Sequence, residues 1–189
     1  YYDPSNHQVL DFVGGYDDLE DGVVRIIGDP ETRYREDPVR MLRAIRFIGK
    51  LGLSLEDGTS EPIRRLALLL RDVSASRLFD EVLKLLQAGY GRVSFPYLIH
   101  HDLLKALFPS TSDLLESTDD THYRQLINLA LNNTDIRLKE GKSVTPAFLY
   151  AALYWPKVHH RWQELAAEGH GRTQSLAIAS SETLALNQQ

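Results

Sequence analysis

The stretch Arg33–Phe47, RYREDPVRMLRAIRF, places two adjacent carboxylates, Glu36 and Asp37, directly before a row of arginines. Asp37 precedes Pro38, and this pair predicts a helix start, because an Asp side chain accepts a free backbone N–H and Pro suits the first helical position. We therefore expect a helix over residues 37–51, with both carboxylates at its N-terminus.

The expected helix has two different faces. Arg40 and Arg43 are three residues apart and share one face, whereas Met41, Ile45 and Ile48 follow helical spacing on roughly the opposite face. The apolar face is expected to pack in the core, and the arginine face is expected to remain polar.

A carboxylate beside a guanidinium presents an acceptor next to a donor, which complements an amino group next to a ring nitrogen. Adenine and cytosine both carry that pattern on their base-pairing edges. The alternative is that these charges only cap the helix and form ion pairs along a solvated face, which composition by itself favours.

The segment Glu36–Phe47, EDPVRMLRAIRF, resembles the EDxxR signature of the class II nucleotidyltransferases, the superfamily of bacterial poly(A) polymerases and CCA-adding tRNA enzymes. Upstream, Asp11–Pro30 is similar to the hinge between the catalytic head and the helical neck of these proteins. Downstream, Ser76–Leu86, SRLFDEVLKLL, resembles their RxxxE helix. Within the superfamily, the amino-acid sequence of the chain is most similar to those of the bacterial poly(A) polymerases.

The resemblance implies roles for four residues of the first motif. Asp37 would accept a hydrogen bond from the exocyclic amine of adenine, and Arg40 would donate to a ring nitrogen. Glu36 and Arg43 would hold these two side chains in orientation. The motif is therefore expected to be a nucleotide-binding site.

In the RxxxE segment, Arg77 and Glu81 are four residues apart and are expected to share a helix face. Leu78, Val82 and Leu85 form an apolar stripe on the same helix. By resemblance, Arg77 and Glu81 form a supporting shell that packs this helix against the EDxxR helix; the alternative is a plain exposed ion pair.

The catalytic head of the superfamily carries a DxD pair that binds metal, and no such pattern is found here; Asp17 and Asp18 are contiguous. The resemblance implies a longer protein that adds AMP from ATP to RNA 3′ ends with Mg²⁺ bound by its head. We expect no catalytic or metal-binding residue in this chain, and no activity from it alone. The expected partners are the RNA 3′ end, ATP and, for the longer protein, RNA-degradation machinery.

The expected fold is mainly α, with a short strand pair left from the head. Residues 1–28 would be the last strands and hinge of the head, 29–88 a helical neck that binds nucleotide and RNA, and 89–189 a helical body. Val, Ile and Phe in Gln8–Val13 and Gly22–Ile27 predict that these two segments pair as strands.

Helical patterns follow from residue 37 onwards, and Pro156 is expected to kink or end the helix that contains it. The expected helices cover residues 37–51, 61–70, 76–87, 94–106, 121–139, 145–168 and 173–186.

The net charge of the 189 residues is −5, which argues against a broad nucleic-acid surface, although residues 25–50 hold seven basic against four acidic side chains. RNA affinity is therefore expected to be weak. There is no cysteine, which excludes disulfides and thiolate metal sites. No apolar run of 18 residues and no leader pattern is found, so no membrane contact and a cytoplasmic location are expected.

Two other functions compete with this interpretation. A CCA-adding tRNA nucleotidyltransferase would use the same motif, since cytosine and adenine share the amine-next-to-nitrogen pattern. A noncatalytic helical module that binds RNA or protein belongs to a different class.

Overall fold

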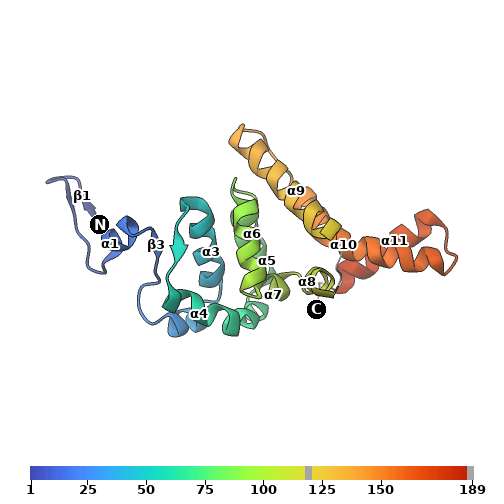
Figure 1. Ribbon diagram of the computed structural model, residues 1–189, viewed down its shortest axis with the longest axis horizontal. Coiled ribbons are helices and arrows are strands. Elements are labelled where there is room, and N and C mark those ends of the chain that lie inside the picture. Colours follow the sequence, from blue (N-terminus) through green and yellow to red (C-terminus); the bar gives the residue numbers. More distant parts are fainter. Residues whose placement is uncertain (118–120, 187–189) are drawn as a thin grey trace.

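The computed structural model describes residues 1–117 and 121–186 and is an elongated array of helices (Figure 1). The expectation of a mainly α chain with a short strand pair near its N-terminus is confirmed. Within the described residues, no helix is both long and apolar enough to cross a membrane. In chain order the elements are β1 (Tyr2–Asp3), β2 (Gln8–Val9), α1 (Gly15–Glu20), β3 (Val23–Val24), α2 (Pro30–Glu36), α3 (Val39–Leu51), β4 (Ser54–Leu55), α4 (Asp57–Leu66), the 3₁₀ helix η1 (Ala67–Asp72), α5 (Ala75–Leu86), α6 (Gly91–His100), α7 (Leu103–Leu107), α8 (Pro109–Ser117), α9 (Thr121–Lys139), α10 (Pro146–Ala167) and α11 (Arg172–Leu186).

The strands near the N-terminus pair differently from the expectation. β1 and β2 form an antiparallel pair, whereas β3 pairs in parallel with β4, which follows α3. The expected pairing of Gln8–Val13 with Gly22–Ile27 is therefore wrong. The Asp11 carboxylate accepts the backbone N–H groups of Val13 and Tyr16 at 3.0 and 2.7 Å, which turns the chain into α1 instead of a hairpin.

The long helices lie where their periodicity predicts them. α3, α5, α9, α10 and α11 match the expected ranges to within two residues at each end. The expectation was that Pro156 would kink or end its helix; α10 continues through Pro156, so the proline does not end it. Leu149 and Leu153 before the proline and Leu165 after it are buried, so the helix packs on both sides of Pro156.

Two of the expected ranges are divided. Residues 61–70 are shared by α4 and η1, and α4 begins earlier because the Glu56 carboxylate accepts the Thr59 N–H at 2.6 Å. Residues 94–106 are interrupted at Asp102, which adopts φ 57°, between α6 and α7. The short helices α1, α2 and α8 had no counterpart among the expected ones.

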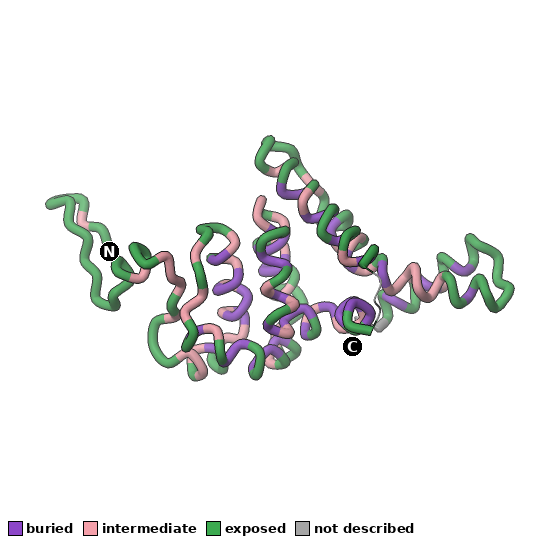
Figure 2. Tube along the Cα trace, in the orientation of Figure 1, coloured by how far each residue is buried: buried purple, intermediate pink, exposed green. Residues whose placement is uncertain are grey.

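One buried apolar cluster runs from Tyr34 in α2 to Leu153 in α10. It includes the expected core face of α3, since Met41, Ile45 and Ile48 are each at most 2% exposed. Figure 2 shows the buried residues concentrated from α3 onwards, whereas no residue before Tyr34 is buried. The core is continuous across residue 88, and the division into neck and body stays a prediction.

The Asp135 carboxylate joins α9 to the start of α6. Its oxygens accept the backbone N–H groups of Gly91 and Arg92 at 2.8 and 2.9 Å. Asp135 is buried, with 7% of the residue exposed. These N–H groups open α6 and have no partner within that helix. Asp135 therefore caps α6 from a helix more than 40 residues further along the chain.

Replacing Asp135 by Asn is expected to lower the free energy of unfolding by about 1–3 kcal/mol, because an amide offers one acceptor oxygen to two buried donors. Urea unfolding measures the loss, and faster hydrogen exchange at the Gly91 and Arg92 amides locates it. Asp113→Asn is the matched control, since its side chain is 66% exposed. Equal stability of the two variants would contradict the capping role.

Candidate functional site

The EDxxR motif forms a corner between two helices. Asp37 is extended (φ −148°, ψ 94°), because the following Pro38 disfavours a helical conformation for the preceding residue. Glu36 is the last residue of α2, and α3 begins at Val39. The expected helix start at Asp37 is thus two residues too early, and Glu36 ends one helix instead of opening the next.

The expected cap is nevertheless present. Asp37 Oδ1 accepts the Val39 backbone N–H at 3.3 Å, and Pro38 already has helical dihedral angles (φ −59°, ψ −25°). The carboxylate therefore lies over the first turn of α3, where the helix dipole favours negative charge.

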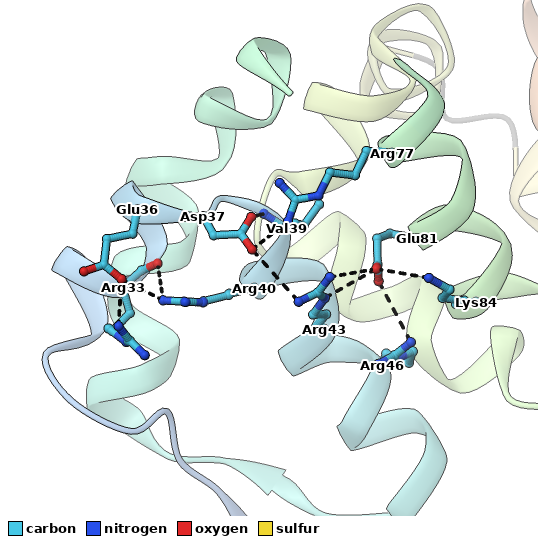
Figure 3. A network of polar contacts seen from close by, with 10 residues as sticks. All are labelled: Arg33, Glu36, Asp37, Val39, Arg40, Arg43, Arg46, Arg77, Glu81 and Lys84. Atoms are coloured by element: carbon cyan, nitrogen blue, oxygen red, sulfur yellow. Dashed lines mark hydrogen bonds and ion pairs between the residues drawn. The ribbon is translucent and has the colours of Figure 1, made fainter. Parts of the chain in front are cut away.

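Glu36 holds two arginines at the corner (Figure 3). Its Oε2 accepts from Arg33 Nη1 at 2.8 Å and from Arg40 Nη1 at 3.0 Å. The same Arg40 nitrogen donates to the Arg33 carbonyl at 3.2 Å. Arg40 is thus fixed through Nη1, and among the described residues no hydrogen-bond partner lies at its Nε or Nη2.

Asp37 is joined to α5. Its Oδ2 accepts from Arg77 Nη2 at 2.7 Å and lies 4.0 Å from Arg43 Nη1. Arg77 and Glu81 share the side of α5 that faces α3, and Figure 3 shows both reaching toward it. Each contacts a residue of the EDxxR segment, as a shell supporting that segment would.

Glu81 is the most enclosed charge of this network. Its side chain is 5% exposed, and Oε1 accepts from Arg43 Nη2 at 3.1 Å and from Lys84 Nζ at 3.4 Å. Arg46 Nη1 lies 3.9 Å from Oε2. Burial raises the pKa of the carboxyl, but the hydrogen bonds and charges of Arg43 and Lys84 outweigh it and leave the pKa below its usual value. The ionised Glu81 therefore ties α5 to α3.

A hollow of about 280 Å³ lies beside the corner, between α3 and the segment that follows β3. Arg33, Arg40 and Arg43 line it together with apolar side chains, whereas Glu36 and Asp37 are not among the lining residues. The lining residues are Val24, Arg25, Ile26, Ile27, Arg33, Arg40, Arg43, Ala44, Phe47 and Thr59. A cationic, partly apolar hollow of this kind suits a planar ring attached to phosphates.

The sequence reasoning missed three members of the network: Arg33, Arg46 and Lys84. Each had a signal in its spacing, because Arg33 and Lys84 lie three residues from Glu36 and Glu81, and Arg46 continues the arginine row at i+3 from Arg43. All three are cations that compensate the carboxylates of the two motifs.

Glu81→Gln is expected to lower the free energy of unfolding at pH 7 by about 1–3 kcal/mol, since a neutral amide cannot compensate the cations around it. Because the folded pKa is lowered, the carboxylate stabilises the protein above its unfolded pKa of about 4.3. That contribution is lost as the pH falls through the folded pKa. Urea unfolding at several pH values should show a flatter acid limb in the variant.

Glu140→Gln is the control, because Glu140 is 51% exposed and pairs with Lys142 on the surface. It should change stability by less than about 1 kcal/mol. An acid limb that is equally steep in Glu81→Gln and in the unchanged protein would rule out the stabilising role of Glu81.

Comparisons with known proteins agree with the motifs. Residues 52–115 match a family model described as a probable RNA- and SrmB-binding site of polymerase A. The chain is 46% identical to poly(A) polymerase I of Escherichia coli over 185 residues, which are 97% of this chain and 40% of that protein. It is 38% identical to the CCA-adding enzyme of Bacillus subtilis over 152 residues, 76% of this chain and 37% of that protein.

The fold is also found in solved structures. A CCA-adding enzyme in complex with ATP superposes with a TM-score of 0.54 at 22% identity, over 88% of this chain and 46% of that one. The chain spans about 40% of the length of the curated poly(A) polymerase I that it matches. From its motifs, its fold and this likeness along nearly its whole length, the chain belongs to the nucleotidyltransferase family that includes poly(A) polymerase I and the CCA-adding enzymes.

Proposed function

We propose that this chain is the neck and body of a longer polynucleotide adenylyltransferase, which adds AMP from ATP to RNA 3′ ends in the cytoplasm. The observation that carries the proposal is the 46% identity with poly(A) polymerase I over 97% of the chain. Residues 1–28 would connect to the catalytic head, 29–88 would form the neck, and 89–189 the body. The chain would select the nucleotide and hold RNA, and the chemistry would take place on the head.

Magnesium, which the resemblance implies for nucleotidyl transfer, does not fit this part of the protein. In residues 1–117 and 121–186 there is no group of three His, Cys, Asp or Glu side chains that could hold a metal ion. We assign the metal to the head of the longer protein.

Adenine recognition is proposed for Asp37 and Arg40. Arg40 is held by Glu36 through Nη1, which leaves Nε and Nη2 to donate to a ring nitrogen. Asp37 Oδ2 is positioned by Arg77 and flanked by Arg43, and a carboxylate oxygen has a second lone pair for the exocyclic amine. Because Arg40 lines the hollow and Asp37 does not, the base would lie at the edge of the hollow that is nearest the corner.

The network explains why Glu36 and Arg43 are proposed as orienting residues. Glu36 fixes Arg40, and Arg43 is shared between Asp37 and the buried Glu81. Arg77 and Glu81 would act indirectly from α5, because they contact Asp37 and Arg43 and not the base. A planar guanidinium held at one nitrogen loses little further freedom when it binds a ligand.

Arg40→Ala and Asp37→Ala in the longer protein are expected to lower kcat/KM for ATP by roughly 10–100-fold, the loss of one hydrogen bond to a charged group. The preference for ATP over the other nucleotides should fall with it. Steady-state kinetics with each nucleotide measures both effects.

Arg35→Ala is the control, because Arg35 lies on α2 and pairs with Glu31 away from the hollow. Arg40→Ala and Asp37→Ala variants that melt at lower temperature but keep the ATP preference would show that the motif is structural.

CCA addition is the second candidate function, favoured by the Bacillus subtilis relative and by the shared base pattern of adenine and cytosine. Incubating the longer protein with an unstructured RNA and each nucleotide separately distinguishes the two. Long tails that require ATP alone support the proposal, whereas addition limited to C, C and A on tRNA supports the second candidate. RNA binding without any nucleotide addition would identify a noncatalytic module instead.

A further inference from the structure

A second hollow, of about 600 Å³, lies away from the candidate nucleotide site. It is formed where the C-terminal end of α3, the turn from α5 to α6 and the C-terminal end of α9 meet. Figure 1 shows these three helix ends on the same side of the molecule. It is lined by Gly49, Lys50, Ala88, Gly89, Tyr90, Arg92, Val93, Asn132, Asp135, Ile136, Leu138 and Lys139, and is called here the basic hollow.

The basic hollow gathers cations that have no acidic partner among the residues that the structure describes. Lys50, Arg92 and Lys139 come from three different helices, and all three are exposed. In the part of the chain that the structure describes, no carboxylate lies within 4.0 Å of any of them, although most arginines around the EDxxR corner are paired with acids. Three unpaired positive charges around one concavity attract an anionic ligand.

The single acid of the basic hollow is already engaged. Both oxygens of Asp135 accept backbone N–H groups at the start of α6. Arg92 is steadied by a hydrogen bond from Nη1 to Asn132 Oδ1 at 3.1 Å, and the Lys139 stem lies over Gly89. Tyr90 also lines the basic hollow, and its hydroxyl donates to the Lys84 carbonyl at 3.2 Å.

The close approach of the helices that builds this concavity depends on Gly49. A Cβ at this position would collide with Ser94 Oγ and would lie 3.1 Å from the Tyr90 ring. Glycine therefore allows α3 to rest against α6, and this brings Lys50 beside Tyr90 and Arg92.

A row of cations on α3 connects the basic hollow to the candidate nucleotide site. Arg43, Arg46 and Lys50 follow spacings of three and four residues and so share one side of the helix. Two turns, about 10 Å, separate the first from the last. Arg43 lines the 280 Å³ hollow beside the EDxxR corner, and Lys50 lines the basic hollow. One nucleic-acid strand could therefore contact both hollows.

From this placement we propose that the basic hollow binds the phosphates of a single RNA strand, upstream of the 3′ end that reaches the nucleotide site. The inference rests on the proposed function, since it gives the RNA strand a path. The occupant is a phosphate backbone because the three cations are exposed and come from three separate helices, which suits repeated phosphates more than a single small anion. The Tyr90 ring adds a surface against which a base can lie.

The test uses the longer protein and a short single-stranded RNA, without nucleotide, with Kd measured by fluorescence anisotropy over a series of salt concentrations. The triple variant Lys50→Gln, Arg92→Gln, Lys139→Gln should weaken binding at least about tenfold and reduce the slope of log Kd against log salt by about 2. Each substitution alone should reduce that slope by about 0.7, which keeps the test valid if the triple variant does not fold.

The control is the triple variant Arg71→Gln, Lys105→Gln, Lys157→Gln, which removes the same charge elsewhere and should leave the slope almost unchanged. An equal effect of both triple variants would show that only overall charge matters and would overturn the inference. Unchanged RNA binding by the variants of the basic hollow would also overturn the inference, even if those variants bound a protein partner more weakly.

Failure of this inference can be separated from failure of the proposed function. Kd is read without catalysis, so a protein that makes no ATP-dependent tails can still show binding in the basic hollow. In an active protein, the hollow variants should raise KM for RNA and leave KM for ATP at saturating RNA unchanged. A parallel rise in both constants would indicate a structural effect and would overturn the inference.

Discussion

Glu81 is a carboxylate with a 5% exposed side chain, and the arrangement of the site depends on how its charge is compensated. An ionised group at such depth is costly unless opposite charges surround it. Arg43 supplies one, and in doing so it is directed to a position between Glu81 and Asp37. Arg77, one helical turn before Glu81, holds the other end of this arrangement at Asp37.

The corner at Glu36 and Asp37 is therefore not a free loop. α5 holds it directly through the Arg77–Asp37 ion pair and indirectly through Glu81, which pairs with Arg43 of α3. α5 also packs against α3, and its Val82 and Leu85 are part of the buried core. A change in the angle between α3 and α5 would move Asp37 relative to Arg40, which is held from α2 by Glu36. The geometry of the candidate site and the packing of α3 against α5 are coupled through the same few charges.

The sequence was sufficient for the parts of the fold that repeat over many residues. The apolar faces of α3 and α5 and the extents of α9, α10 and α11 followed from periodicity, because burial of a long stripe decides a helix regardless of its neighbours. Short elements did not follow. α2 carries the same Asp-Pro opening as the EDxxR motif, at Asp29 and Pro30, but its seven residues are too few for a periodic pattern.

The candidate site was predictable in its residue types and less so in its pairing. Spacing along one helix suggested that Arg77 and Glu81 belong together. Their partners lie about 40 residues away: Arg77 donates to the Asp37 carboxylate, and Glu81 accepts from the Arg43 guanidinium. Likewise the strand partner of β3 is β4, which lies about 30 residues further along the chain and depends on where α3 ends. Such long-range pairings are set by tertiary packing and leave no periodic trace.

The distribution of charge gives a different view of RNA affinity from the net charge of −5. Acidic side chains that already accept hydrogen bonds from arginines or backbone amides present little field to an approaching strand, as Asp37, Glu81 and Asp135 do. Cations without such partners keep their full attraction, and three of them lie around one hollow. Because screening limits each charge to about 10 Å at moderate salt, a phosphate in that hollow responds to Lys50, Arg92 and Lys139 and little to acids at the far end of the elongated molecule.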